Sequence, residues 1–120
     1  MAAKVLIIDD SEEFLTMFTD ILTEFKHEVI QASGGAEGIK KLQEEKPDII
    51  FLDYKMPKMN GLEVLAQIRK ADKEVKVVIL TGYAEMDVAV KAHYLGIFEF
   101  MKKPFSMEEI KNVIEKALKK

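Results

Sequence analysis

The 120-residue sequence contains no cysteine, which excludes disulfide bonds and thiolate metal sites. No apolar run approaches membrane-spanning length, and no apolar signal segment precedes the first predicted strand, so we expect a cytoplasmic protein. Basic charge is also scarce: 18 Lys and Arg against 21 Asp and Glu give a net charge of -3, and the pI is 5.5. A surface that follows nucleic-acid phosphates needs the opposite balance. We therefore expect neither nucleic acid nor membrane as a direct partner.

What the sequence does contain is ordinary for one globular domain. Hydrophobic residues make up 48% of the chain and charged residues 32%. A chain of this length can bury most of its apolar surface in one core. No linker, repeat or low-complexity segment interrupts it. The prediction is a single domain over residues 1–120.

Five apolar runs alternate with segments whose apolar residues recur at helical spacing. This alternation predicts repeated βα units and an α/β fold with a parallel sheet. We expect strands near 4–8, 28–32, 49–52, 77–81 and 98–102. Helices are expected near 12–25 and 35–45, after Asn60, near 84–95, and from Met107 onward. Right-handed crossovers place such helices on both faces of a doubly wound sheet, here with strand order 2-1-3-4-5.

Local signals mark several helix boundaries. Ser11 stands at the N-cap position of the first helix, and Asn60 and Ser106 each precede a Glu by three residues, as in a capping box. Gly96 is expected to end the fourth helix. On the first helix, Leu15 lies at the margin of an apolar stripe, and methionines 17, 86 and 101 are expected to fill core gaps. That stripe consists of Phe14, Met17, Phe18, Ile21, Leu22 and Phe25.

Polar residues follow four of the predicted strands. Asp9 and Asp10 come after the first, Asp53 after the third, Thr81 at the end of the fourth and Lys103 after the fifth. In open α/β sheets, ligands bind outside the carboxyl ends of the strands where the strand order reverses. Two carboxylates ~4 Å apart repel by ~4 kcal/mol at an effective dielectric constant near 20, so this edge requires a cation. Oxygen ligands without histidine or cysteine favour Mg²⁺.

Four motifs in register with these strand ends carry a family resemblance. They are Asp9-Asp10, Asp53-Tyr54-Lys55-Met56-Pro57, Thr81-Gly82 and Phe100-Met101-Lys102-Lys103-Pro104-Phe105. With them, essentially the whole chain resembles the receiver domains of two-component response regulators. The resemblance implies a flavodoxin-like sheet. Together with Lys55, the run Thr81-Gly82-Tyr83 makes the chain more similar to enhancer-binding-protein receivers and the single-domain sporulation phosphorelay intermediate than to the chemotaxis regulator.

The resemblance implies a function and a cofactor. A receiver accepts a phosphoryl group from a phosphohistidine of a sensor kinase or phosphotransfer protein in a Mg²⁺-dependent reaction. It then switches its surface for an output partner or relays the group. Asp53 would be the phosphoacceptor, and Asp10, Asp53 and the backbone carbonyl of Lys55 would bind Mg²⁺, with Asp9 acting partly through water. Such a protein is not a conventional enzyme, because it catalyses its own phosphorylation and slow dephosphorylation.

Further roles are implied for the residues around this acceptor. Thr81 and Lys103 would bind phosphoryl oxygens, and Phe100 occupies the position of the family's switch aromatic, moving together with Thr81. The bond between Lys103 and Pro104 is cis in most of the family. Lys55 and Tyr83 are expected to screen the phosphate from water. His27 and His93 are expected to bind no metal.

A recognition surface is predicted around the same crevice. Phe14 and Leu15 at the margin of the first helix, with Pro104 and Phe105 beyond the fifth strand, would dock the histidine-bearing helices of the donor.

Other functions remain open on sequence grounds. A flavin-binding electron carrier shares this strand order, but Asp9 and Asp10 would repel the flavin phosphate. An aspartate-nucleophile phosphatase typically carries its nucleophile in a D-x-D pattern after the first strand, which this chain lacks. A phosphorylation-independent interaction module is disfavoured because every charge of the site is present. The chain is also compatible with a receiver domain of a larger regulator.

Overall fold

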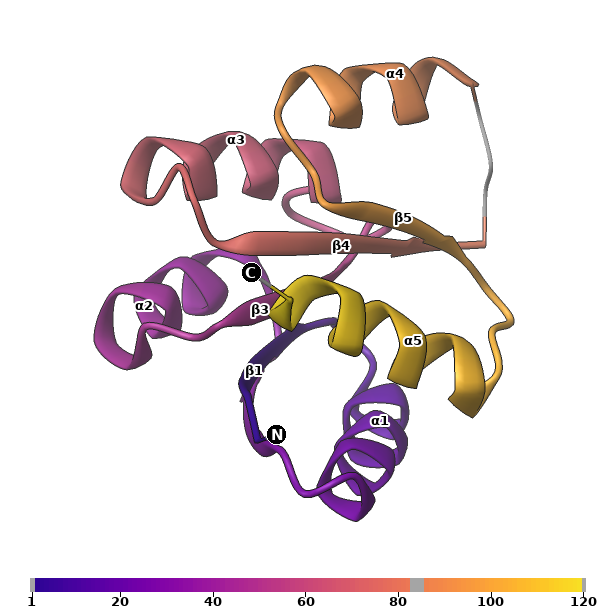
Figure 1. Ribbon diagram of the computed structural model, residues 1–120. Helices are drawn as coiled ribbons and strands as arrows, with labels where there is room; N and C mark the ends of the chain where they lie inside the picture. The colour runs from indigo at the N-terminus through magenta and orange to yellow at the C-terminus, as the bar shows by residue number, and fades with distance from the viewer. Residues whose placement is uncertain (1, 83–85, 120) are drawn as a thin grey trace.

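A computed structural model describes residues 2–82 and 86–119, which form a five-stranded parallel sheet between two layers of helices (Figure 1). The strands are β1 (Lys4–Ile8), β2 (Glu28–Ala32), β3 (Ile49–Asp53), β4 (Lys76–Thr81) and β5 (Glu99–Lys102). The helices are α1 (Glu12–Glu24), α2 (Gly35–Glu45), α3 (Gly61–Ala71), α4 (Met86–Tyr94) and α5 (Met107–Leu118). The sheet order is β2-β1-β3-β4-β5, so the predicted flavodoxin-like fold is confirmed.

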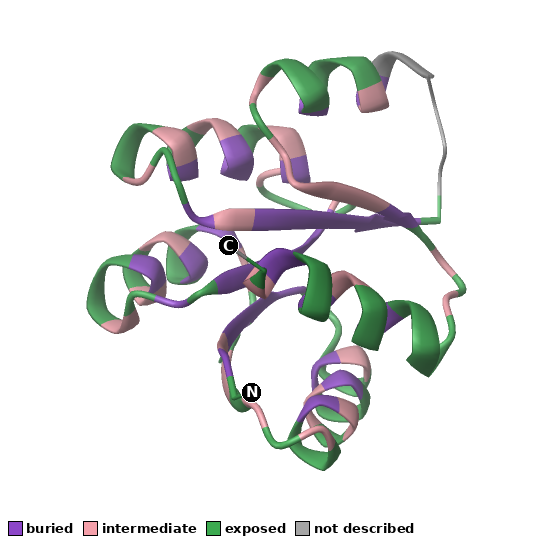
Figure 2. Cartoon of the chain, viewed as in Figure 1, coloured by how far each residue is buried: buried purple, intermediate pink, exposed green. Residues whose placement is uncertain are grey.

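The strand boundaries agree with the predictions to within one residue. The fourth helix was expected from residue 84, but residues 84 and 85 lie outside the described part of the chain. β3 is buried along its whole length because helices cover both sheet faces (Figure 2). Helices α1 and α5 pack on one face, and α2, α3 and α4 pack on the other (Figure 1). Among the described helices, none has the length and apolarity needed to cross a membrane.

The orientation of α1 corrects two predictions. Leu15, placed at the margin of the stripe, is 5% exposed, while Met17, expected in the core, is 48% exposed. Fully buried Phe18 marks the centre of the face that packs on the sheet. Met17 precedes it by one residue and therefore lies about 100° around the helix. Of the other methionines, Met101 is buried as predicted, and the side chain of Met86 lies outside the described part.

The predicted helix caps are present. The Ser11 hydroxyl accepts a hydrogen bond from the backbone N–H of Phe14, and Asn60 and Ser106 both form capping boxes. Gly96 follows α4 with a φ of 86°, a left-handed conformation that glycine adopts without steric cost. The peptide bond between Lys103 and Pro104 is cis, as the resemblance implied.

His27 supports a prediction about acid stability. Its Nδ1 atom accepts a hydrogen bond of 3.0 Å from the backbone N–H of Ala3, which only an unprotonated Nδ1 can do. Burial lowers the His27 pKa below its ordinary value of 6.5. The stabilising contribution is therefore complete above pH 6.5 and is lost as the pH falls through the lowered pKa. His27→Gln is expected to cost about 1 kcal/mol at neutral pH and less in acid.

Urea unfolding at neutral and acidic pH measures this difference. His93→Gln is the matched control because His93 lies exposed on α4. If His27→Gln lowered the free energy of unfolding equally at both pH values, the stabilising role of unprotonated His27 would be contradicted.

Candidate functional site

The carboxyl edge of the sheet brings together polar residues at the ends of β1, β3 and β4. β1 pairs with β2 on one side and with β3 on the other, so the order in which strands are added to the sheet reverses at β1. Asp53 ends β3 and is paired with Leu80 of β4, directly before Thr81. Asp9 follows the end of β1. The polar residues predicted to converge therefore lie at the point where the strand order reverses, the usual place for a ligand in an open α/β sheet.

Three carboxylates form a cluster at this edge. One oxygen from each of Asp9, Asp10 and Asp53 lies within 4.8 Å of the other two. Asp9 and Asp53 are only 2% and 7% exposed, whereas Asp10 is open to solvent. The cluster thus has a buried floor and one accessible side.

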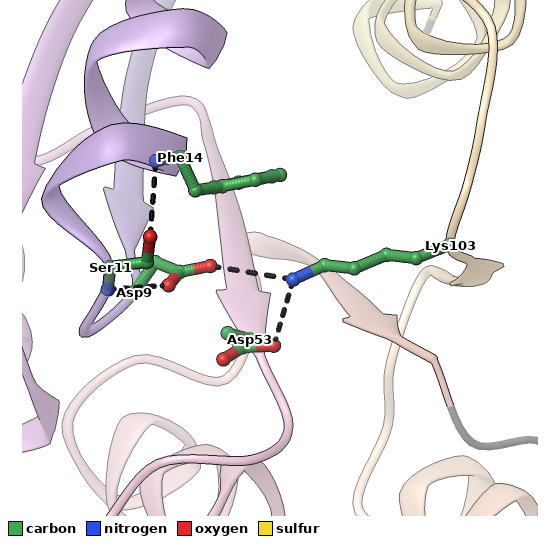
Figure 3. Close-up of polar contacts among 5 residues, drawn as sticks. All are labelled: Asp9, Ser11, Phe14, Asp53 and Lys103. Carbon is green, nitrogen blue, oxygen red and sulfur yellow. Dashed lines mark hydrogen bonds and ion pairs between the residues drawn. The ribbon is translucent and has the colours of Figure 1, made fainter.

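Lys103 reaches this cluster from the segment after β5 (Figure 3). Its Nζ donates a hydrogen bond of 3.2 Å to Asp53 Oδ1 and lies 3.6 Å from Asp9 Oδ2, an ion-pair distance. Its backbone N–H donates to the carbonyl oxygen of Thr81 at 2.7 Å. The end of β4 therefore helps to hold the segment that carries the ammonium group.

Electrostatics leave the cluster short of positive charge. Burial, and next the negative charge of Asp9, raise the pKa of Asp53, and Lys103 lowers it; the net result is a pKa of about 6. Burial also raises the pKa of Asp9, although the Ser11 backbone N–H, 2.9 Å from Oδ1, and Lys103 act in the opposite direction. The single positive charge of Lys103 does not balance the negative charge of the three carboxylates.

The donor atoms present fit a hard divalent cation. Among the described residues, Asp9 Oδ2 is the buried side-chain atom that has no hydrogen-bond partner. Carboxylate oxygens from Asp9, Asp10 and Asp53 make up an all-oxygen set open to water on one side, which is what Mg²⁺ prefers. Lys55, whose carbonyl was predicted as a further ligand, lies exposed in the β3–α3 connection.

The other predicted site residues are Thr81, Phe100 and Tyr83, of which the structure describes the first two. Thr81 is 1% exposed at the end of β4. Phe100, on β5, is half-buried and packs into the core on the side of α2, α3 and α4. Tyr83 falls outside the described residues.

The predicted recognition surface is only partly exposed. Pro104 is exposed, and Phe14 and Phe105 are half-buried with their rings edge to face at 6.3 Å. Leu15 is buried in the core between α1 and the sheet, so its place in an exposed surface was wrong. The prediction was wrong because Phe18 lies at the centre of the α1 face that packs on the sheet, and Leu15 lies on that same face.

Two features of the site were missed from the sequence. The Ser11 backbone N–H donates a hydrogen bond to the Asp9 side chain and so orients it, as in an Asx-turn. The sequence signal for this turn is the spacing Asp9-x-Ser11. Gly61, the first residue of α3, packs against the backbone next to Asp53. A Cβ at Gly61 would lie 2.8 Å from Tyr54 Cα and 3.0 Å from the Asp53 carbonyl oxygen. In the sequence, the Asn60-Gly61 pair indicates only the start of a helix, and the close approach is seen in the structure alone.

Gly61→Ala is expected to disturb the acceptor strand. Because the added carbon meets backbone atoms that cannot rotate away, the substitution should cost about 1–3 kcal/mol of stability. The amide resonances of Asp53 and Tyr54 should shift, as measured by NMR. Gly34→Ala is the control, since no atom lies within 4 Å of its added carbon. Equal spectra for the two variants at Asp53 would show that this contact is relaxed.

Comparisons with known proteins agree with this geometry. The family model of the response regulator receiver domain matches residues 5–115. The sporulation initiation phosphotransferase F of Bacillus subtilis is 30% identical over 98% of this chain and 95% of its own length. The chemotaxis protein CheY of Listeria monocytogenes is 39% identical over 97% and 98%, respectively. The identity to the chemotaxis protein is higher than the identity to the sporulation protein, so overall identity does not support the greater similarity to the sporulation class that the residues at 55 and 81–83 predicted.

Solved structures show the same relationship. A response regulator receiver domain protein from Clostridium thermocellum superposes with a TM-score of 0.92 at 34% identity, covering 97% of this chain and 94% of that one. The chemotaxis protein CheY4 of Vibrio cholerae gives 0.93 at 28% identity, covering 98% and 100%. Sheet order, strand-end residues and both comparisons lead to one conclusion: this chain belongs to the response regulator receiver domains of two-component signalling.

Proposed function

We propose that this receiver accepts a phosphoryl group on Asp53 from a phosphohistidine of a sensor histidine kinase or a phosphotransfer protein. The reaction takes place in the cytoplasm and depends on Mg²⁺. The observation that carries the proposal is the position of the Asp53 carboxylate, which lies in a cluster with two further carboxylates and 3.2 Å from the Lys103 ammonium. The phosphorylated protein then either presents a changed surface to an output partner or relays the group.

The chemistry asks mainly for alignment and charge. Asp9, Asp10, Asp53 and the Lys55 carbonyl would hold Mg²⁺, which when bound supplies positive charge next to the transferred group. An oxygen of Asp53 forms the new bond to phosphorus while the bond from phosphorus to the donor histidine nitrogen breaks, and that nitrogen keeps the electron pair. A loose transition state spreads negative charge over three oxygens. Lys103 and the Thr81 hydroxyl would stabilise that charge.

The same residues suggest how the surface changes. The aspartyl phosphate carries up to about two negative charges where the carboxylate carried one, and it brings new acceptor oxygens. The Thr81 hydroxyl would move toward them, and Phe100, half-buried on the neighbouring strand, would turn into the space that Thr81 leaves. β5 and its flanking helices would carry the change to a partner.

Wild-type protein and a small phosphodonor test the proposal directly. Incubation with acetyl phosphate and Mg²⁺ should add one phosphoryl group, as measured by intact mass, and peptide mapping should place it on Asp53. Excess EDTA should prevent the reaction. Incorporation that is equal in EDTA, or a stable phosphate on another residue, would refute the mechanism.

The donor would dock on the rim of the crevice formed by Phe14, Pro104 and Phe105. Titration with a histidine phosphotransfer domain should shift the amide resonances of Phe14 and Phe105 most. Leu118, at the far end of α5, is the internal control. Larger shifts at Leu118 than at the rim would move the docking surface away from the acceptor.

A further inference from the structure

The Lys103 ammonium group has a third neighbour besides the two carboxylates. Its Nζ lies over the ring of Phe14, 4.4 Å from the ring centroid (Figure 3). A cation at this distance from an aromatic face is attracted by the negative charge of the ring face, and the attraction grows as water is removed. The Lys103 side chain is 30% exposed, so water is partly excluded from this contact.

The Phe14 ring is held in place by other rings. It stacks on Phe18 with the centroids 5.2 Å apart and the planes 17° apart, and it meets the Phe105 ring edge to face. Phe18 is fully buried and also contacts Phe51 of β3, two residues before Asp53. The ring under the ammonium is therefore anchored to the strand that carries the acceptor.

The backbone ties Phe14 to the carboxylates as well. Ser11 donates its N–H to Asp9 Oδ1 and accepts the N–H of Phe14 on its hydroxyl, at 2.9 Å and 3.2 Å. The first turn of α1 thus sets the position of the ring relative to Asp9. Asp9 Oδ2 and the Phe14 ring both contact Lys103 Nζ. The first turn of α1 therefore fixes the relative position of two of the groups that surround the ammonium.

We propose that Phe14 is a positioning residue that keeps the Lys103 ammonium at the Asp53 carboxylate. A lysine side chain has a flexible four-carbon stem, so its ammonium group needs several contacts to stay in one place. The ion pairs to Asp9 and Asp53 weaken whenever a divalent cation neutralises these carboxylates. The attraction of the uncharged ring does not depend on that neutralisation. Phe14 therefore holds the ammonium where a phosphoryl oxygen arrives, in both the metal-free and the metal-bound protein.

This role differs from the docking role proposed above for the exposed part of Phe14. A docking residue affects transfer from a protein donor alone, whereas a residue that positions Lys103 affects transfer from a small donor too. The kinetic consequence rests on the proposed phosphorylation of Asp53. The contact itself does not, and it is measured separately.

NMR of the unphosphorylated protein tests the contact. The Lys103 side-chain resonances should be shifted upfield by the ring current of Phe14, with and without Mg²⁺. Phe14→Leu should return them toward the values of a free lysine, while Phe14→Tyr should keep the shift. Phe25→Leu, a half-buried Phe at the other end of the same helix, is the matched control. Unchanged Lys103 resonances in Phe14→Leu would overturn the proposal.

Phosphorylation by acetyl phosphate tests the consequence. Phe14→Leu should react about threefold to tenfold more slowly than the wild type, and Phe14→Tyr should restore the rate. Phe25→Leu should react at the wild-type rate. A wild-type rate for Phe14→Leu would refute the positioning role, and equal losses in the Leu and Tyr variants would do the same. If the wild type is not phosphorylated at all, the proposed function fails, and the NMR result still decides whether Phe14 holds Lys103.

Discussion

Asp53→Asn is expected to abolish phosphorylation by small phosphodonors, reducing its rate at least about a hundredfold. The amide has almost the size of the carboxylate, so the fold should be kept, but it lacks the anionic oxygen that attacks phosphorus. Lys103 also contacts Asp9 and Phe14, and we expect these contacts to remain in the variant. The measurement is phosphoryl incorporation by intact mass after incubation with acetyl phosphate and Mg²⁺.

Asp20→Asn is the matched control for this experiment. Asp20 lies exposed on α1, so the same chemical change there should leave the rate unchanged. Incorporation into the Asp53 variant at the wild-type rate, on Asp10 or elsewhere, would show that another carboxylate is the acceptor.

The same substitution is expected to stabilise the metal-free protein at neutral pH, by about 3 kcal/mol. The pKa of Asp53 is raised from 3.8 to about 6, chiefly by burial. The folded state thus binds this proton more tightly than the unfolded chain does, and ionisation costs folding free energy. That cost is absent below pH 3.8, grows as the pH rises, and is complete above about 6. Asn cannot ionise and avoids it.

Urea unfolding in EDTA across this pH range measures the effect. The Asp53→Asn and wild-type stabilities should approach each other in acid and separate toward neutral pH, while Asp20→Asn follows the wild type. Adding Mg²⁺ should stabilise the wild type more than the variant, because the ion binds the folded state through Asp53. A stability difference that stays constant from acid to neutral pH would contradict this account.

The fold follows from the sequence because its signals are local and agree with one another. Apolar runs such as Ile49–Leu52 are too short for helices and are buried on both faces of a parallel sheet. Ser11, Asn60 and Ser106 mark helix starts through hydrogen bonds that span three residues. The convergence of Asp9 and Asp53 needs only one further fact, that the carboxyl ends of parallel strands meet at one edge.

Only the tertiary structure determines which side chains on these helices and strands are buried and which contacts they make with other elements. Leu15 and Met17 are both apolar, and only the rotation of α1 against the sheet determines that the first is buried and the second exposed. The contact of Phe14 with Lys103 joins residues far apart in the chain, so no spacing predicts it. The close approach of Gly61 to Tyr54 depends on how the first residue of α3 packs against the end of β3. Sequence patterns place residues on elements, whereas contacts between elements depend on distances of a few ångströms that only packing sets.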